Sequence, residues 1–525
     1  MGGKKPSQIE FGGHCCVPAH LLPRLLFSVS FGIIYTVSEA FQVGLTRNGK
    51  AWWVATLLLL APPIAAQAQD FTWTTNADET ITITGYTGSG RMADIPSNIM
   101  DKIVTRIGTN AFHSCTSLTG ISIPKSVTNI GRYAFYNCAS LTNAVIPESV
   151  NNIDGWLYTS CENLVWVTIP NSVTNIGTQA FMHCESLTNV VIPDSVKSIG
   201  GTAFMYCDSL LSVSIGSGLK STGSQPFGNC TNLNEILVSD DNSIYSSTNG
   251  VLFNKSQTTL IQCPGGKTGS YTVPESVTNI EIYAFLWCAG VTRVTIPASV
   301  TSIGRSAILY CSNLTEIAVN EGNPIYGSTN GVLFNKSQTT LIQCPGGKIG
   351  SYTVPNSVTS IGERGFEYCT SLTRVTIPNS VTNIGEYAFT RCAGLVGIYF
   401  KGNAPSLFDT RVFYDTSNST NYYLSGTIGW PLVPDPWPEG NYGRPTALWL
   451  PAATDDGSFG VQAEKFGFNI DWTDGQTVVV EANTDMNTTN WVPVATNILD
   501  STPFYFGDPE WTNYPGRFYR IRRSP

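Results

Sequence analysis

Ten cysteines and two histidines are the residues of this chain whose types are best suited to chemistry. Thiolates act as nucleophiles, bind zinc and form disulfides, and an imidazole beside a thiol can activate it. The cysteines recur 23 residues apart, apart from two intervals of 58 residues. They are Cys115, Cys138, Cys161, Cys184, Cys207, Cys230, Cys288, Cys311, Cys369 and Cys392. A fixed interval indicates a repeated structural position rather than one reactive site.

The two histidines outside the N-terminal segment do not form a catalytic pattern with these thiols. His113 and His183 lie just before or beside a cysteine, and adjacent side chains seldom face each other. A nucleophilic pair of His183 and Cys184 would also need an accessible, activated thiolate. Serine-hydrolase, zinc-protease and phosphate-loop motifs are missing, and acidic pairs such as Asp455-Asp456 lie in expected loops. We therefore predict no enzyme activity, no metal and no cofactor.

The expected state of the cysteines is a row of buried free thiols. Neighbouring parallel coils lie about 4.8 Å apart with side chains that point the same way. A disulfide instead needs convergent Cβ atoms about 3.8 Å apart. Disulfides formed after export and a zinc site are the two alternatives, although close-spaced Cys-x-x-Cys pairs are missing.

The same interval carries a pattern of apolar residues around each cysteine. After Cys115 come Leu118, Ile121 and Ile123, then a proline, and Ala134-Phe135 precede the next cysteine. Alternating apolar residues predict a short parallel strand, which the proline ends. A 23-residue coil cannot by itself offset about 1 to 2 kcal/mol of backbone entropy per residue. Stacked coils must bury the remaining apolar surface, so the pattern predicts a solenoid.

The recurring cysteine, Ile-Pro, Ser-Val-Thr, Ile-Gly and Ala-Phe elements resemble the BspA-type leucine-rich repeat of bacterial secreted and surface proteins. The resemblance covers about residues 103–400. It implies a curved right-handed solenoid used for adhesion or protein binding without intrinsic catalysis. The sequence departs from the pattern at Asp154, at Leu157-Tyr158, at Ile308 and at Gly216.

The expected fold is mainly β, with a leucine-rich repeat solenoid followed by a small C-terminal β-sandwich-like module. We assign residues 1–68 to an over-long N-terminus and signal peptide, 69–106 to an N-terminal cap, 107–400 to the solenoid, 401–450 to a C-terminal cap or linker and 451–525 to the module. The module's strands are expected near residues 466–470, 478–480, 491–494, 504–506 and 517–521.

An export signal is expected before residue 69, which predicts a secreted or cell-surface protein. Arg47 and Lys50 precede a short apolar run, and Ala66-Gln67-Ala68 forms a cleavage site of small residues. The residues before Arg47 include an apolar stretch, 21–37, which we attribute to an over-called start codon; a transmembrane anchor is the alternative. A net charge of -8 disfavours nucleic-acid binding. No other run is long and apolar enough to span a bilayer, so the signal is the only expected membrane contact.

The two long intervals each hold 35 extra residues, and these inserts are near copies. Residues 247–267 reappear without change as residues 328–348. Two apolar runs, 251–253 and 260–262, flank a polar turn and predict a hairpin. The inserts are either a pair of binding knobs or simply enlarged coils.

Large outward side chains are the candidate ligand-binding residues. Trp166, Arg293, Arg374 and Tyr399 lie between the inward residues of the strands and are of types favoured at binding hot spots. A second stripe just before the cysteines comprises Tyr206, Trp287, Tyr310 and Tyr368, which either face a ligand or pack on neighbouring coils.

The expected function is a non-catalytic scaffold for an extracellular protein or glycan. The alternative is an accessory protein of a secreted polysaccharide-degrading system. In that case the C-terminal module would bind carbohydrate through Trp491, Trp511, Tyr514 and Tyr519, although these rings could equally be packing residues.

Overall fold

The computed structural model describes most of the chain after the predicted export signal. It covers residues 70–525 except 406, 409–410, 417–418, 431–445, 451, 454–457, 459, 463–464, 474, 486–487, 500–502, 515 and 525. Strands and turns account for nearly all of it, as the sequence predicts. The predicted signal peptide and the apolar stretch 21–37 lie outside the described residues. Within the described ranges, no helix is long and apolar enough to cross a membrane.

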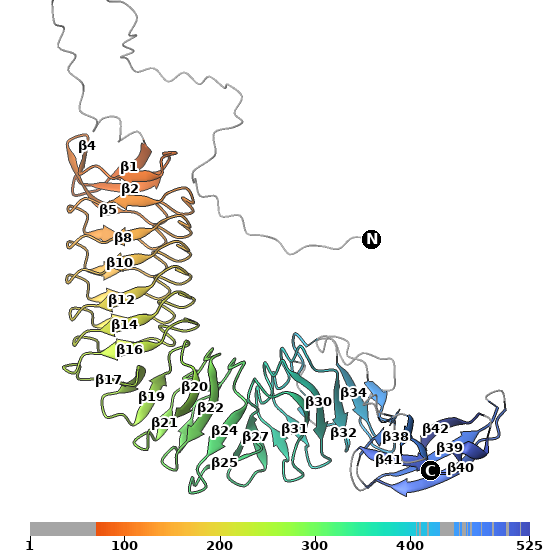
Figure 1. The fold of residues 1–525 in the computed structure, drawn as a ribbon. Helices are drawn as coiled ribbons and strands as arrows, with labels where there is room; N and C mark the ends of the chain where they lie inside the picture. Colours follow the sequence, from red (N-terminus) through yellow and green to blue (C-terminus); the bar gives the residue numbers. More distant parts are fainter. Residues whose placement is uncertain are drawn as a thin grey trace, which may run out of the picture. The chain divides into compact units, whose positions relative to one another are not determined.

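Each regular coil has two short strands joined by turns (Figure 1). In the coil that ends at Cys184, these are β10 (Trp166–Thr168) and β11 (Asn175–Ile176). β10 pairs in parallel with β8 (Asn143–Val145) of the preceding coil. β11 pairs in parallel with β9 (Asn152–Ile153) before it and β13 (Ser198–Ile199) after it. The strand hydrogen bonds therefore join coil to coil, which explains why one repeat needs its neighbours.

The recurring Ile-Gly pair is required by close approach of adjacent coils. A Cβ atom on Gly177 would lie 2.4 Å from the backbone nitrogen of Gly155 in the preceding coil. On Gly385 it would lie 2.5 Å from the backbone nitrogen of Glu363. Glycine leaves room for backbone on backbone at these two places, although Asp154 and Glu281 take the same position in two other coils.

The recurring Ala-Phe pair builds a column of stacked rings in the core. Phe112, Phe135, Tyr158, Phe181 and Phe204 follow one another with ring centroids 5.0 to 5.4 Å apart. All five are fully buried. The apolar columns predicted from the repeat are therefore continuous along the coils.

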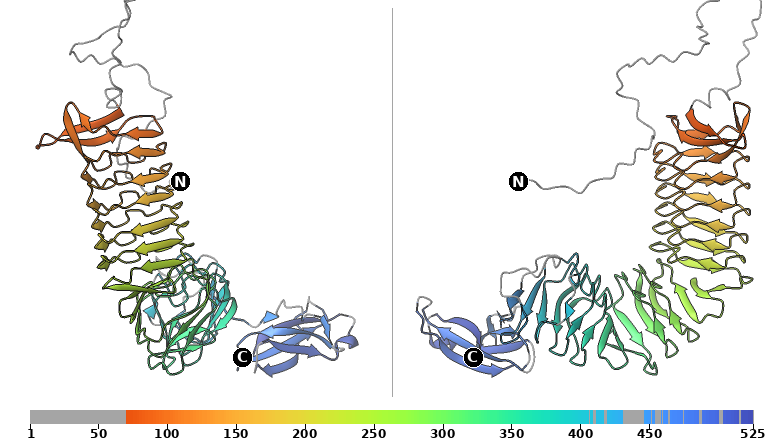
Figure 2. Two further views of the ribbon diagram at one scale, coloured as in Figure 1. Left: turned by 60° about the vertical axis from the view of Figure 1, so that its left-hand side comes forward. Right: turned by 180° about the vertical axis from the view of Figure 1, so that it is seen from behind.

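The described part of the chain divides into two compact units, 70–210 with Gly218–Phe227, and Leu211–Ser217 with the described residues from Gly228 onward. The first unit begins with β1 (Phe71–Thr75) and β2 (Ile81–Tyr86), which are antiparallel. β2 runs parallel to β5 (Lys102–Ile107), and β5 runs parallel to β7 (Asn129–Ile130). The N-terminal strands thus merge into the first rungs, and Figure 2 shows the rungs of this unit from two further sides.

The first long interval contains the predicted hairpin. β18 (Val251–Asn254) pairs antiparallel with β17 (Tyr245–Thr248) and with β19 (Thr259–Gln262). β19 then runs parallel to β21 (Asn279–Ile280). The second interval repeats this arrangement with β25 (Tyr326–Thr329), β26 (Val332–Asn335), β27 (Thr340–Gln343) and β29 (Ser360–Ile361).

Each long interval contains two coils rather than one coil with an insert. Cys263 takes a core position, and its backbone nitrogen donates to Ala284 of the following coil. β20 (Gly269–Thr272) then pairs in parallel with β22 (Val291–Ile296) as an ordinary rung. Cys344 and β28 (Gly350–Thr353) repeat this in the second interval. The extra coil escapes the sequence pattern because it lacks the Ile-Gly and Ala-Phe turn before its cysteine.

The parallel sheet also continues past Phe400, where the sequence pattern ends. β32 (Gly397–Phe400) is followed by β34 (Thr420–Tyr423) and β35 (Thr446–Leu448), all in parallel. The segment assigned to an irregular cap or linker therefore includes two further rungs.

The C-terminal module has two antiparallel sheets, which confirms the sandwich-like prediction. One contains β36 (Ala452–Ala453), β37 (Gly460–Gln462), β38 (Lys465–Asp471) and β41 (Phe504–Asp508). The other contains β39 (Thr477–Asn483), β40 (Val492–Ile498) and β42 (Phe518–Arg523). Their shared core includes Phe468, Ile470, Val478 and Val480.

Candidate ligand-binding surfaces

The cysteines are hydrogen-bond donors inside the core. All twelve described cysteines are buried and free. Cys138 Sγ donates to the carbonyl of Phe112 at 3.0 Å, and Cys184 Sγ donates to that of Tyr158 at 3.3 Å. Burial raises the pKa of Cys184, and it raises the pKa of Cys311 to about 12. Such thiols stay protonated near neutral pH, so they are poor nucleophiles and poor metal ligands.

The two histidines have partners other than the thiols. The His183 ring stacks on Tyr206 with centroids 4.4 Å apart, while Cys184 Sγ donates to a backbone carbonyl. His113 stacks on Tyr136, and burial lowers its pKa. Within the described ranges, no group of three or more His, Cys, Asp or Glu residues is placed to hold a metal ion.

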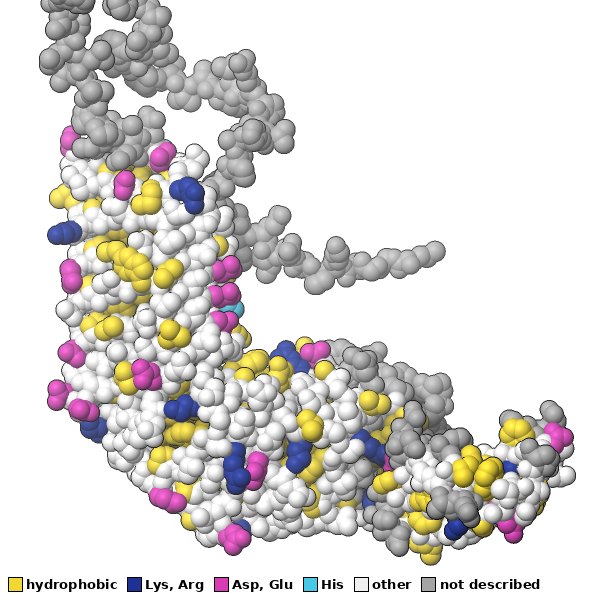
Figure 3. Space-filling view, in the orientation of Figure 1, with side chains coloured by type: hydrophobic (Ala, Val, Ile, Leu, Met, Phe, Trp, Pro, Cys, Tyr) yellow, Lys and Arg dark blue, Asp and Glu magenta, His cyan; other side chains and the backbone are white. Residues whose placement is uncertain are grey.

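Among the predicted aromatic residues of the solenoid, Trp166 is the one that the structure leaves exposed. Its side chain is 44% exposed on β10, between Asn143 of β8 and Asn189 of β12 (Asn189–Ile192). Three exposed aliphatic residues lie directly before it or on the two neighbouring strands, and we call these four residues the Trp166 patch. They are Val145, 51% exposed, Val165, 42% exposed, Trp166 and Val191, 66% exposed. Hydrophobic side chains gather over β8 to β12 in Figure 3.

The other three outward residues have partners within the chain. Arg293 is exposed but forms an ion pair with Glu316 at 2.9 Å. Arg374 forms an ion pair with Asp471 of the C-terminal module, and its guanidinium lies 3.8 Å from the ring centroid of Tyr399. The Tyr399 ring also lies against Trp449, with centroids 4.9 Å apart. Arg374 and Tyr399 thus join the last regular coils to the module.

The predicted aromatic stripe lies along the turns, and its rings pack on neighbouring coils while staying partly exposed. Trp287 stacks on Tyr310 with centroids 4.4 Å apart, and Tyr368 meets Tyr310 edge-on at 4.8 Å. The Tyr310 hydroxyl donates to the buried carboxylate of Glu367 at 2.7 Å. Burial and this bond raise the pKa of Tyr310 to about 12. Tyr206 lies on His183 as described above, so packing between coils accounts for all four rings.

The aromatic residues of the C-terminal module also have internal partners. Arg520 lies 4.6 Å from the ring centroid of Trp491, and Arg517 lies 4.3 Å from that of Tyr514. The Trp511 ring is 6.4 Å from Phe466, and Tyr519 stacks on the same phenylalanine at 5.3 Å. Packing within the module therefore occupies these rings.

The sequence model of one repeat family matches most of the solenoid. Residues 91–207, 157–268, 263–347 and 343–429 match the BspA type leucine rich repeat region, in six copies. The chain belongs to the BspA-type leucine-rich repeat family. Proteins of this family are typically bacterial surface or secreted proteins and are generally non-catalytic. The match extends to residue 429, in agreement with the rungs that follow Phe400.

Solved structures of bacterial leucine-rich repeat proteins are similar to this BspA-type chain. A leucine rich cell surface protein from Faecalibacterium prausnitzii is 29% identical over 64% of this chain and 94% of its own, with a TM-score of 0.46. The T. pallidum leucine rich repeat protein is 26% identical over 47% and 89%, with a TM-score of 0.31. The pneumococcal vaccine antigen PcpA is 18% identical over 68% and 92%, with a TM-score of 0.41. No curated protein matches the chain.

Sequence reasoning missed one feature of these surfaces and one feature of the core. The aliphatic neighbours of Trp166 belong to a column of small and β-branched residues, so their types alone did not separate them from ordinary strand residues. Thr416 also takes the place of a cysteine one coil after Cys392, and its hydroxyl donates to the carbonyl of Phe389. Thr416 follows Cys392 by 24 residues, close to the regular 23-residue spacing, and this spacing could have identified it as the counterpart of the cysteine.

Proposed function

We propose that this BspA-type protein is an exported, non-catalytic scaffold that binds another protein through the Trp166 patch. The export signal that the sequence predicts in residues 47–68 supports export, and the family supports a surface or secreted location. One observation carries the binding proposal: an exposed tryptophan lies among three exposed aliphatic side chains on regular, paired strands.

The composition of the face favours a protein partner. The outward positions of β8, β10 and β12 hold Asn143, Val145, Trp166, Thr168, Asn189 and Val191, none of which is charged. Cores of protein interfaces are depleted in charge and enriched in aromatic residues, and tryptophan is among the commonest hot-spot residues. Clustered exposed apolar side chains mark interaction sites more often than isolated ones do.

The paired strands keep this face in shape before binding. β8 and β10 are in register, with Trp166 opposite Asn143 and Thr168 opposite Val145. The backbone beneath the patch is therefore ordered in the free protein, so binding loses little additional conformational entropy.

The test is a binding screen with a matched pair of variants. The purified full chain is applied to an array of extracellular proteins, and each hit is measured again with Trp166→Ala and with Ile349→Ala. Ile349 is also an exposed apolar residue, but it lies outside the patch. Trp166→Ala should weaken binding about thirty-fold, as expected for a hot spot of about 2 kcal/mol, while Ile349→Ala should change it little.

Circular dichroism confirms that both variants fold. Protein binding that is equally strong in Trp166→Ala would contradict the proposal. A glycan array that detects sugar binding lost in Trp166→Ala, with no protein hit, would replace the protein ligand with a glycan.

A further inference from the structure

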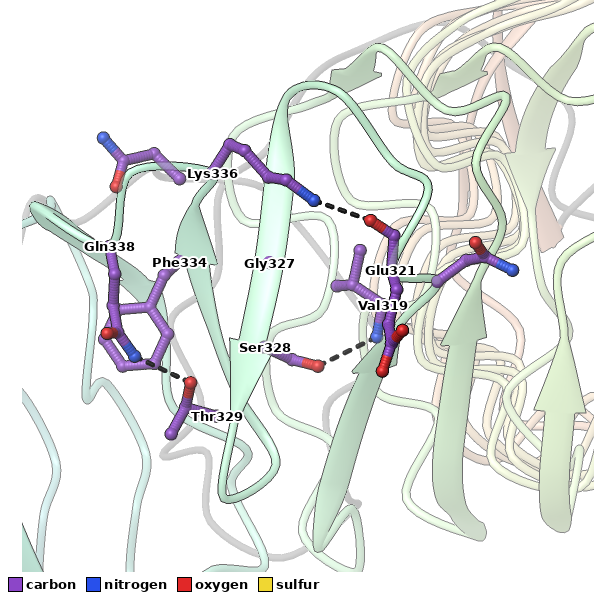
Figure 4. A pocket seen from close by; sticks show the side chains of 10 residues that line it. Val319, Glu321, Gly327, Ser328, Thr329, Phe334, Lys336 and Gln338 are labelled. Atoms are coloured by element: carbon purple, nitrogen blue, oxygen red, sulfur yellow. Dashed lines mark hydrogen bonds between the residues drawn. The ribbon is translucent and has the colours of Figure 1, made fainter.

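The near-identical segments in the two long intervals differ at a position that opens a hollow. In the second, a hollow of about 280 Å³ lies between the end of β24 (Glu316–Val319) and the strands β25 and β26. Figure 4 shows side chains from all three strands around it. Its lining comprises Val319, Asn320, Glu321, Gly327, Ser328, Thr329, Phe334, Asn335, Lys336 and Gln338.

One substitution between the copies changes the floor of this hollow. Ser246 of the first copy donates its hydroxyl to the carbonyl of Asn254 at 2.9 Å. The corresponding residue of the second copy is Gly327. A Cβ atom on Gly327 would have the carbonyl oxygen of Asn335 as its nearest neighbour, at 4.0 Å. The glycine therefore opens space beside this carbonyl, where the first copy has a hydroxyl.

The carbonyl oxygen of Asn335 can accept one further hydrogen bond from a group in the hollow. It accepts the backbone N–H of Gln338 at 2.9 Å, just as the Asn254 carbonyl accepts that of Gln257 at 3.0 Å. A carbonyl oxygen has two lone pairs, and in the first copy the serine hydroxyl uses the second. A ligand hydroxyl in the hollow would make the same hydrogen bond in the second copy.

Hydrogen bonds hold the polar side chains of the rim in place. Gln338 Nε2 donates to Thr329 Oγ1 at 2.7 Å, and Ser357 donates to Gln338 Oε1 at 3.1 Å. Lys336 Nζ donates to the backbone oxygen of Glu321 at 2.7 Å. These donors and acceptors are therefore positioned before a ligand arrives, which reduces the entropy lost on binding.

The lining is neutral overall and mixes hydrogen-bonding groups with an apolar wall. It contains one ammonium group and one carboxylate, those of Lys336 and Glu321, so it favours neither a phosphate nor a cation. Half-buried Val319 supplies the apolar surface, the Phe334 side chain is buried in the core, and the remaining groups are hydroxyls, amides and a backbone carbonyl. The volume is just below the range of about 300 to 1,000 Å³ for drug-sized ligands, so it suits one small unit.

We propose that the hollow beside Gly327 binds one neutral pyranose residue of a glycan. A pyranose carries hydroxyls that both donate and accept, together with an apolar C–H face, and the lining offers partners for both. This site is separate from the Trp166 patch and does not depend on it.

The test uses the two copies as matched controls. Saturation-transfer difference NMR is recorded on the full chain with methyl glycosides of glucose, galactose, mannose, fucose and N-acetylglucosamine. At least one should bind, and Gly327→Ser should weaken it at least ten-fold by placing the serine of the first copy in the hollow. Ser246→Gly, the reverse change in the other copy, should leave that binding unchanged, and so should Trp166→Ala.

The variant should fold because the first copy already has serine at this register, and thermal unfolding checks this. Binding of no glycoside would overturn the proposal, as would equal binding by Gly327→Ser. Binding of N-acetyl amino acid amides but of no glycoside would overturn it as well.

Discussion

Exchanging Cys184 for threonine or valine tests whether the cysteine ladder serves as a row of hydrogen-bond donors. Threonine and valine have nearly the same shape, but only threonine keeps a donor. The protein already contains such a threonine, because Thr416 donates to Phe389 in the same way that Cys184 donates to Tyr158. Steric effects of the branched side chain should be common to both variants, so their difference isolates the donor.

The expected difference follows from the partners of the Tyr158 carbonyl. This oxygen also accepts the backbone N–H of Cys161 at 3.2 Å, so valine would remove only one of its two hydrogen bonds. Leaving a buried polar group unpaired costs about 1 to 3 kcal/mol, and a carbonyl that keeps one partner belongs at the lower end of that range. We expect Cys184→Val to be about 1 kcal/mol less stable than Cys184→Thr. The equilibrium constant for local opening should therefore be about five-fold larger in the valine variant.

Amide hydrogen exchange measured by mass spectrometry on peptides from residues 153–190 gives this equilibrium locally. A local measurement is needed because long repeat arrays do not unfold in a single two-state step. Exchange in this region should be fastest in the valine variant, and peptides from the C-terminal module serve as the internal control. If valine protects these amides as well as threonine or better, the thiols do not act as donors and our interpretation of the ladder is wrong.

Three further changes have defined outcomes. Tyr158→Phe should slow amide exchange in the neighbouring coils about ten-fold, because within the described residues the buried Tyr158 hydroxyl has no hydrogen-bond partner. Arg374→Ala should speed exchange in β38, whereas Arg293→Ala, which removes an exposed ion pair, should have little effect on it. Glu481→Gln should lower the melting temperature of the module at pH 7. Arg522 and Arg520 hold the pKa of Glu481 below its usual value, so its contribution is present above the ordinary carboxyl pKa and is lost as the pH falls through the folded pKa. The variant and the native chain should therefore melt alike in acid, as followed by tryptophan fluorescence.

The repeat fold was predictable because each coil repeats the same short-range choices. The glycine at 177 and the phenylalanine at 181 play the same structural role as their counterparts in other regular coils. The 23-residue spacing of the cysteines was therefore enough to predict the regular coils. The extra coils at Cys263 and Cys344 were not predicted, because they reach the core without the turn that marks the others. The rungs after Phe400 were missed for a similar reason, since Thr416 replaces the cysteine.

The candidate surfaces were less predictable because exposure depends on contacts distant in sequence. Trp166 lies on the outward side, as predicted, and it is exposed beside the shorter side chains of Asn143 and Asn189. Arg374 occupies the same column, but Asp471, 97 positions later, meets its guanidinium. The strand pattern predicts an outward position for both residues. Only the contact with the C-terminal module in the folded protein distinguishes Arg374 from Trp166.

Function in such a chain should lie where the coils differ. A residue that recurs in most coils, such as the glycine at 177 or the phenylalanine at 181, is explained by stacking and carries no information about a ligand. Trp166 is the only aromatic residue at its strand position among the regular coils, and Gly327 is one of few differences between two almost identical segments. Neither departure is needed for stacking, since asparagine occupies the first position in the coils on either side and serine occupies the second in the other copy. The two proposed sites are therefore places where the fold leaves the residue free to be selected for binding.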